Sequence, residues 1–165
     1  MGDKIAFKIG ERTFGIDIEA VHKILEVDRV FFIPGQSGFV NGMVSLMGEP
    51  VTVIDCRKAL GAPEDASSGT PHKIIVIRDR NRMVGLDIDG GALSFIWKEK
   101  IKNAHAFLGS PEDMSEGTPR FTNGMIDVEQ SRQGEPPEGA QPLQGVELID
   151  LAAVFEETKK ILSEQ

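Results

Sequence analysis

The chain has 165 residues, of which 40% are hydrophobic and 27% charged, and its net charge is −8. This length suits one globular domain or two small lobes that share a core. A nucleic-acid backbone requires a basic groove with stacking aromatics, so the negative charge, the single Trp and the lack of Tyr exclude nucleic acid as an expected partner.

The same composition predicts the compartment. Cys56 is the only cysteine, which excludes an intramolecular disulfide and a Cys-based zinc cluster. The first residues show no hydrophobic signal core, and no run approaches the ~18 apolar residues of a membrane span. A negatively charged surface also disfavours contact with anionic lipids. We expect a cytoplasmic protein without direct membrane insertion.

Two segments, residues 5–19 and 75–89, align without gaps at a constant offset of 70. In both, apolar residues alternate with polar or small ones, which is typical of strands with one buried face. Gly10-Glu11 and Arg80-Asn81 interrupt the alternation with the residue types of hairpin turns. Each segment is therefore predicted to form a β-hairpin. After the first hairpin, Ile18, Val21 and Leu25 have the spacing of a short amphipathic helix.

A second repeat follows each hairpin. "FVNGMV" (39–44) precedes the strand-like "VTVIDC" (51–56), and "FTNGMI" (121–126) precedes "VELIDL" (146–151). A glycine inside a strand usually marks a bulge or a sharp bend, which a small barrel needs in order to close. We therefore expect each half of the chain to build one small barrel of about five strands.

The predicted fold is all-β: two five-stranded barrels with short helices and a C-terminal helix. The whole chain, 1–165, is expected to be a single domain. Its expected parts are lobes at 4–60 and 72–150, a connector at 61–71, a mobile Pro- and Gly-rich loop insert at 131–145, and an amphipathic helix at 151–163.

No catalytic or metal-binding pattern is present in the sequence. His22, His72 and His105 lack the spacing of metal ligands, and we expect them to be solvated. Cys56 fits a small buried residue better than a thiol activated by its basic neighbours. "DIDGG" (87–91) fails as a calcium loop, so Asp87 and Asp89 are assigned to the solvent side of a strand. We predict a protein that is not an enzyme and has no cofactor.

Apolar residues without an obvious interior role remain in the first half. The run Val30–Pro34 is one group, and Met43, Leu46 and Met47 cluster beside the first glycine-containing strand. They fit the core. They also fit a groove for a partner, because flexible Met side chains suit surfaces that repack against another protein. The sequence leaves both alternatives open.

The order of these motifs resembles the CheW-type chemotaxis coupling proteins, over about Lys4 to Leu162. In that family a Gly-Ile-Asp-Ile strand precedes Val-x-x-Ile, Ile-Pro, a Gly-containing strand, Leu-Arg-Gly and Pro-Val-Ile-Asp-Leu-Arg. The matching stretches here are Phe14–Ile18, Val21–Ile24, Ile33-Pro34, Gly42, Leu46–Gly48 and Pro50–Arg57.

The resemblance implies two SH3-like barrels and a non-enzymatic adaptor. Its expected partners are the regulatory domain of a chemotaxis-type histidine kinase and the cytoplasmic tip of a helical chemoreceptor. The expected partner-binding residues are Val21, Ile24, Met43, Leu46, Met47, Gly48 and Arg57.

Met47 replaces the arginine of the family's Leu-Arg-Gly, and its side chain cannot supply the fork of donors that arginine offers. Docking at this position must therefore be more apolar, or must serve another partner. Two alternative functions remain: an auxiliary coupler in a non-flagellar sensory pathway, and a small-molecule sensor with its ligand near Met43, Trp97 and Met125.

Overall fold

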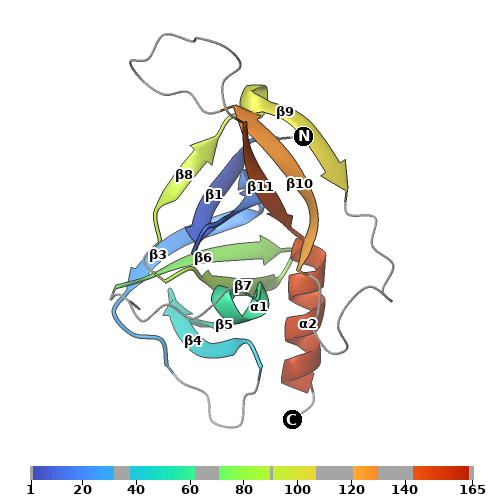
Figure 1. Ribbon diagram of the computed structural model, residues 1–165. Helices are drawn as coiled ribbons and strands as arrows, with labels where there is room; N and C mark the ends of the chain where they lie inside the picture. The colour runs from blue at the N-terminus through green and yellow to red at the C-terminus, as the bar shows by residue number, and fades with distance from the viewer. Residues whose placement is uncertain are drawn as a thin grey trace.

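The computed structural model of the protein describes residues 2–31, 38–61, 71–89, 91–106, 121–129 and 143–163. These residues form two β-sheets, one of six strands and one of five (Figure 1). Residues 62–70 of the predicted connector, most of the loop insert and residues 32–34 of the apolar run lie outside the described residues. Strand β11 begins at Leu143, inside the range that was predicted to be loop.

The elements have the following bounds. The six-stranded sheet has the order β8 (Leu93–Ile96), β1 (Lys4–Ile9), β2 (Arg12–Asp17), β11 (Leu143–Ile149), β10 (Thr122–Glu129) and β9 (Ile101–Ala106). The five-stranded sheet has the order β3 (Val21–Val27), β6 (His72–Asp79), β7 (Arg82–Asp87), β5 (Glu49–Asp55) and β4 (Val40–Leu46). The helices are α1 (Cys56–Ala59) and α2 (Leu151–Ser163), with 3-10 turns η1 (Ile18–Ala20) and η2 (Lys98–Lys100).

Both predicted hairpins are present, but each has joined the strands of the other half. Hairpin β1–β2 pairs with β8 and, in parallel, with β11, whereas β6–β7 pairs with β3 and, in parallel, with β5. The two sheets therefore do not coincide with the consecutive lobes expected at 4–60 and 72–150. The repeat fixes where hairpins form, but the pairing of distant strands depends on which apolar faces meet in the folded chain.

The two repeated glycines are at bulges, as predicted. The strand register shifts between Val40 and Gly42 in the β4–β5 pair, and between Thr122 and Gly124 in the β10–β11 pair. A Cβ atom on Gly42 would lie 2.2 Å from the carbonyl oxygen of Phe31, and one on Gly124 would lie 2.7 Å from that of His105. Glycine is required at both positions because a neighbouring backbone passes too close for any side chain.

Other repeated residues meet in the interior. The rings of Phe39 and Phe121, which open the two copies of the motif, make a T-shaped contact with centroids 5.0 Å apart. The amide of Asp55 donates to the carbonyl of Phe39, and the amide of Asp150 donates to that of Phe121. Asp55 also caps α1 through its carboxylate, and the carboxylate of Asp150 accepts from an amide in the first turn of α2.

The buried apolar side chains of the described residues form three clusters. The largest lies between the sheets and receives side chains from both, whereas a smaller cluster fills each sheet's own interior. In β6, Ile74 and Val76 face the interior of the five-stranded sheet, and Ile75 and Ile77 face the shared cluster. The hairpin strands are thus buried on both faces, not on one face as their alternation predicted.

Two further expectations were wrong. The segment after the first hairpin begins with the single 3-10 turn η1 and continues as strand β3, which pairs with β6 from Val21 to Val27, so no amphipathic helix forms there. Its apolar spacing fits both structures, and pairing with the neighbouring strand decides between them. Asp87 is 6% exposed instead of facing solvent. Its carboxylate accepts hydrogen bonds from the Asn41 side chain and the Asp89 amide, which offset the cost of burial.

Helix α2 spans the predicted residues 151–163 and runs alongside the five-stranded sheet (Figure 1). Val154 and Phe155 are buried, and the guanidinium of Arg82 lies 5.0 Å from the Phe155 ring centroid. Thr158, the polar residue on the buried stripe, donates its hydroxyl hydrogen to the carbonyl of Val154 at 2.7 Å. Leu162, in the last turn of the helix, is 41% exposed. None of the described helices has the length and apolar character required to cross a lipid bilayer.

Candidate protein-docking surface

The turn between β4 and β5 presents an apolar side chain to solvent. It consists of Met47 and Gly48, which both have positive φ angles of 50° and 84°. Glycine tolerates this conformation, whereas methionine adopts it rarely, so the backbone here carries some strain. The turn holds the Met47 side chain 92% exposed. Strain of this kind is found where the surrounding structure over-determines a residue, which often happens at functional positions.

Met47 borders a hollow at one end of the five-stranded sheet. The β4–β5 turn, the β6–β7 turn and the start of β3 converge there around a volume of about 510 Å³. The lining residues are His22, Leu46, Met47, Glu49, Arg78, Asn81 and Met83. We call this the turn-end hollow. Its apolar members are next to groups of both charge signs, which suits a partner surface more than a small ligand of one charge.

The structure brings together some of the sequence-predicted residues and separates others. Leu46, Met47 and Gly48 belong to the turn-end hollow or its rim. Val21 packs partly against the shared core next to His22, and Ile24 is 39% exposed farther along β3. Met43 is half-buried, and its amide and carbonyl exchange hydrogen bonds with Phe31. Arg57 is on α1, where it forms an ion pair with Asp89.

Four residues of the hollow, Glu49, Arg78, Asn81 and Met83, were not predicted as site residues. The last three lie in or beside the β6–β7 turn, which the sequence did predict, and Glu49 follows the β4–β5 turn. What the sequence lacked was the parallel pairing of β5 with β7, which places the two turns at the same end of one sheet. His22 was mistaken for a residue of a helix, so its place beside Met47 could not be inferred.

A buried polar cluster lies around the other ends of β5 and β7. The carboxylate of Asp87 accepts from the Asn41 side-chain amide at 3.0 Å and from the Asp89 amide at 2.9 Å, and it lies 3.1 Å from His72 Nδ1. His72 is therefore bonded rather than simply solvated. Arg57 Nη2 lies 3.4 Å from the Asp89 carboxylate. These contacts hold Arg57 inward, so it is less available to a partner than Met47.

The thiol of Cys56 lies in the same region and is not activated. Burial, together with the negative charges of Asp87 and Asp55, raises the pKa of Cys56 well above its usual value. This result overturns the alternative that basic neighbours lower it, and supports the small buried residue. Among the described residues, no group of three or more His, Cys, Asp or Glu side chains could hold a metal ion.

Stability should depend on the ionisation of Asp87. Burial raises the pKa of Asp87, while the Asp89 amide and His72 lower it to a smaller extent. Because the folded pKa is above the unfolded one, the stabilising contribution is complete below the unfolded pKa and is lost as pH rises through the folded pKa. Asp87→Asn should therefore gain stability relative to the wild type as pH rises from about 4 to 7.

Urea unfolding of both proteins across this pH range measures the difference. Asp28→Asn, at an exposed aspartate, is the control for the loss of one carboxylate. A constant difference between Asp87→Asn and the wild type would contradict the raised pKa of Asp87.

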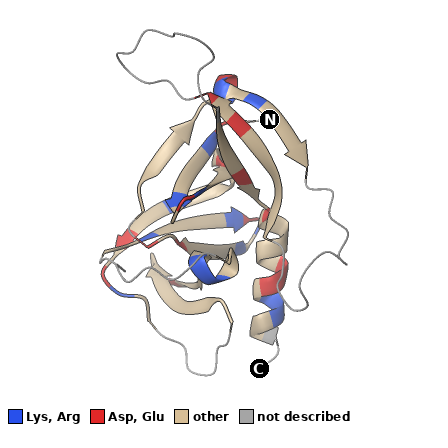
Figure 2. Ribbon diagram, in the orientation of Figure 1, with Lys and Arg blue, Asp and Glu red and all other residues tan. Residues whose placement is uncertain are grey.

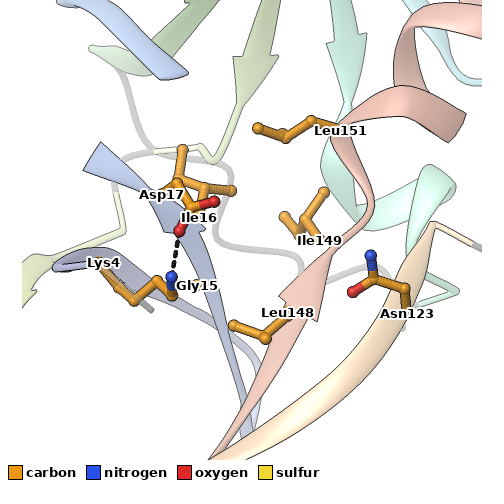
Figure 3. A pocket seen from close by; sticks show the side chains of 9 residues that line it. Lys4, Gly15, Ile16, Asp17, Asn123, Leu148, Ile149 and Leu151 are labelled. Carbon is orange, nitrogen blue, oxygen red and sulfur yellow. Dashed lines mark hydrogen bonds and ion pairs between the residues drawn. The ribbon is translucent and has the colours of Figure 1, made fainter. Parts of the chain in front are cut away.

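A second hollow, of about 480 Å³, opens on the six-stranded sheet (Figure 3). Lys4 lines it and is only 4% exposed, but its ammonium group forms an ion pair with Asp17. The positive charge is thus already neutralised by the protein. Leu148, Ile149 and Leu151 supply most of the apolar wall (Figure 3). Neither this hollow nor the turn-end hollow is lined by Met43, Trp97 or Met125, the residues suggested for a small ligand.

Comparison with known proteins identifies the family. The family model described as the CheW-like domain matches residues 4–158, nearly the whole chain. The chain belongs to the CheW-like domain family. A "Chemotaxis protein CheW" from Klebsiella aerogenes is 33% identical over 86 residues, covering 52% of this chain and 51% of that protein. A "Probable chemotaxis protein CheW" from Rhizobium etli is 32% identical over 90 residues, covering 53% and 57%.

These relatives set a limit on what the likeness covers, because this CheW-like chain spans about half the length of each of them. A solved structure extends the likeness in fold. The scaffolding protein TtCheW from Thermoanaerobacter tengcongensis matches with a TM-score of 0.61 and 19% identity, over 90% of this chain and 88% of that one. The predicted all-β fold with two SH3-like units is confirmed, although one sheet has six strands instead of five.

Proposed function

We propose that this CheW-like protein is a non-enzymatic cytoplasmic adaptor that couples a helical chemoreceptor to a chemotaxis-type histidine kinase. The observation that carries the proposal is the exposed Met47 at the rim of the turn-end hollow, in a member of a family with relatives named chemotaxis proteins. A hollow bordered by a flexible apolar side chain offers a partner a place to insert an anchor residue. Such contacts are commonly small and transient in signalling.

The arrangement of the hollow favours a partner with a rigid apolar surface. Leu46 is 7% exposed and forms the floor, whereas Met47 projects from the turn and can move to meet an incoming side chain. Because Met47 replaces the family's arginine, the contact at this point must be apolar. A helix, whose side chains at positions i, i+3 and i+4 form a continuous stripe, has a suitable shape.

Met47→Asp should weaken binding of one of the two partners about tenfold or more, because a carboxylate must then be desolvated at the contact. Affinities are measured by calorimetry with a purified kinase regulatory domain and, separately, with a cytoplasmic receptor fragment. Ala152→Asp, an equal charge change at an exposed position in α2, should leave both affinities unchanged. Met47→Arg is expected to raise the affinity for a partner that recognises the arginine found at this position in the family.

Two results would contradict the proposal. If neither protein binds the wild type, the adaptor function is wrong. If both bind, and neither Met47 variant changes either affinity, the turn-end hollow is not a docking surface, although another face of the protein can still be.

A further inference from the structure

A pair of exposed aromatic rings lies on the six-stranded sheet, away from the turn-end hollow. Phe95 in β8 is 43% exposed, and Trp97 at the end of that strand is 58% exposed. Their ring centroids are 4.4 Å apart. Exposed tryptophan and phenylalanine side chains in contact are unusual on a protein surface unless something binds there, since each exposes a large apolar area.

The backbone holds this aromatic pair in a defined position. Phe95 pairs with Ile5 in the adjacent strand β1. After Trp97, the amide of Lys98 donates to the Asp3 carboxylate at 2.8 Å, and the amide of Lys100 donates to the Trp97 carbonyl at 2.9 Å. The two rings are therefore presented by an ordered strand end, so a partner would lose little free energy in ordering them.

Lysines follow the pair along the chain, in a protein whose net charge is −8, and the Asp3 carboxylate lies beside the first of them, Lys98. Lys98, Lys100 and Lys102 follow Trp97 on η2 and β9, with Glu99 as the only acidic residue among them (Figure 2). Lys102 forms an ion pair with Glu129 at 3.3 Å. Lys98 and Lys100 have no ion-pair partner within the part of the chain that the structure describes. We call Phe95, Trp97, Lys98 and Lys100 the aromatic–lysine patch.

We propose that the aromatic–lysine patch is a second docking surface, which binds an acidic amphipathic segment of a protein partner. The rings would receive the apolar side chains of the segment, and the lysines would face its carboxylates. An all-apolar partner would leave the lysines unused, and a basic one would be repelled by them. The surface lies on a different sheet from the turn-end hollow, so this inference does not rest on the proposed function.

Trp97 is the only tryptophan in the chain, so its fluorescence reports on the patch itself. The probe is a 15-residue amphipathic helical peptide of Glu and Leu, titrated into the full-length protein. We expect saturable binding that shifts Trp97 emission to shorter wavelength and weakens at least tenfold when salt rises from about 50 to 500 mM. The same peptide with Lys in place of Glu, a Glu–Ser peptide, an oligonucleotide and anionic vesicles should bind at least tenfold more weakly.

Matched variants locate the binding. Lys98→Glu/Lys100→Glu, which keeps Trp97, should lower the affinity for the Glu–Leu peptide at least tenfold, and Phe95→Ser should lower it to a similar extent. Lys23→Glu/Lys159→Glu, which makes the same change of net charge on β3 and α2, should leave the affinity within about twofold of wild type. Circular dichroism and the Trp97 emission of each free variant check that the fold is kept.

Other outcomes overturn the proposal. One is that the Glu–Leu peptide causes no shift of Trp97 emission. Another is that Lys23→Glu/Lys159→Glu loses as much affinity for this peptide as Lys98→Glu/Lys100→Glu does. The third is that the oligonucleotide or the vesicles bind more tightly than the peptide. If the Lys98/Lys100 variant is misfolded, Lys98→Ala alone replaces it, with a loss of at least threefold expected.

Discussion

Gly42→Ala should lower the free energy of unfolding by about 2–4 kcal/mol, because the new methyl group overlaps a backbone that cannot move away freely. Its Cβ atom would lie 2.2 Å from the Phe31 carbonyl oxygen and 3.0 Å from Val30 Cγ1. Phe31 is tied to β4 by two hydrogen bonds with Met43, of 2.9 and 2.8 Å, so relief of the clash must break that bridge. Equilibrium unfolding in urea measures the loss.

Two other alanine variants calibrate this result. Gly124→Ala, at the equivalent bulge, should cost less, because its Cβ would lie 2.7 Å from the His105 carbonyl oxygen. Ser45→Ala, on an exposed position of the same strand β4, should change stability by less than about 0.5 kcal/mol. A Gly42→Ala protein as stable as Ser45→Ala would show that the Phe31 backbone does not pass so close.

Arg12→Ala should lower the free energy of unfolding by about 2–3 kcal/mol. Arg12 Nε and Nη2 each donate to the Glu147 carboxylate at 2.8 Å, and Nη1 donates to the Leu60 carbonyl at 2.7 Å. One side chain thereby joins β2, β11 and the end of α1, which connects the two sheets. The hydrogen bond to Glu147 is the main cause that raises the pKa of Arg12, so the guanidinium stays charged.

Arg12→Lys tests the geometry separately from the charge. Lysine cannot donate to both carboxylate oxygens and to the Leu60 carbonyl at once, so about 1–2 kcal/mol should still be lost. When Arg12→Lys is combined with Glu147→Ala, the free energy of unfolding should fall by less than the sum of the decreases in the two single variants. Arg29→Lys, at an exposed arginine, is the control and should be nearly neutral. If Arg12→Lys were as stable as the wild type, the three guanidinium hydrogen bonds of Arg12 would not be what stabilises the fold here.

The parallel strand pairs give these contacts their importance. Hairpin β1–β2, from the first half of the chain, belongs to the sheet whose other strands come from the second half. Hairpin β6–β7, from the second half, belongs to the sheet whose other strands come from the first half, so each sheet needs strands from both halves. The largest apolar cluster is shared between the sheets. Damage at Gly42 or Arg12 is therefore expected to weaken the whole molecule in one cooperative transition, not one lobe alone.

Local features of the fold could be predicted from the sequence alone. The repeat located the hairpin turns at Gly10 and Arg80 and the glycine bulges, and the amphipathic pattern located helix α2. Turn residues, strand bulges and helical spacing follow from neighbouring side chains and backbone angles. The resemblance to the CheW-type proteins implied Leu46, Met47 and Gly48 as partner-binding residues, with Met47 departing from the family pattern.

Which strands pair, and which residues face solvent, depends on contacts between distant parts of the folded chain. Strand β3, which was predicted as a helix, exists because β6 lies beside it, and Asp87 is buried because Asn41 and His72 reach it from other strands. The exposure of Met47 depends on the β4–β5 turn, which projects from one end of the five-stranded sheet. The aromatic–lysine patch depends on the end of β8, which a hydrogen bond to Asp3 holds in place. Such contacts join residues far apart in the chain, and local periodicity carries no information about them.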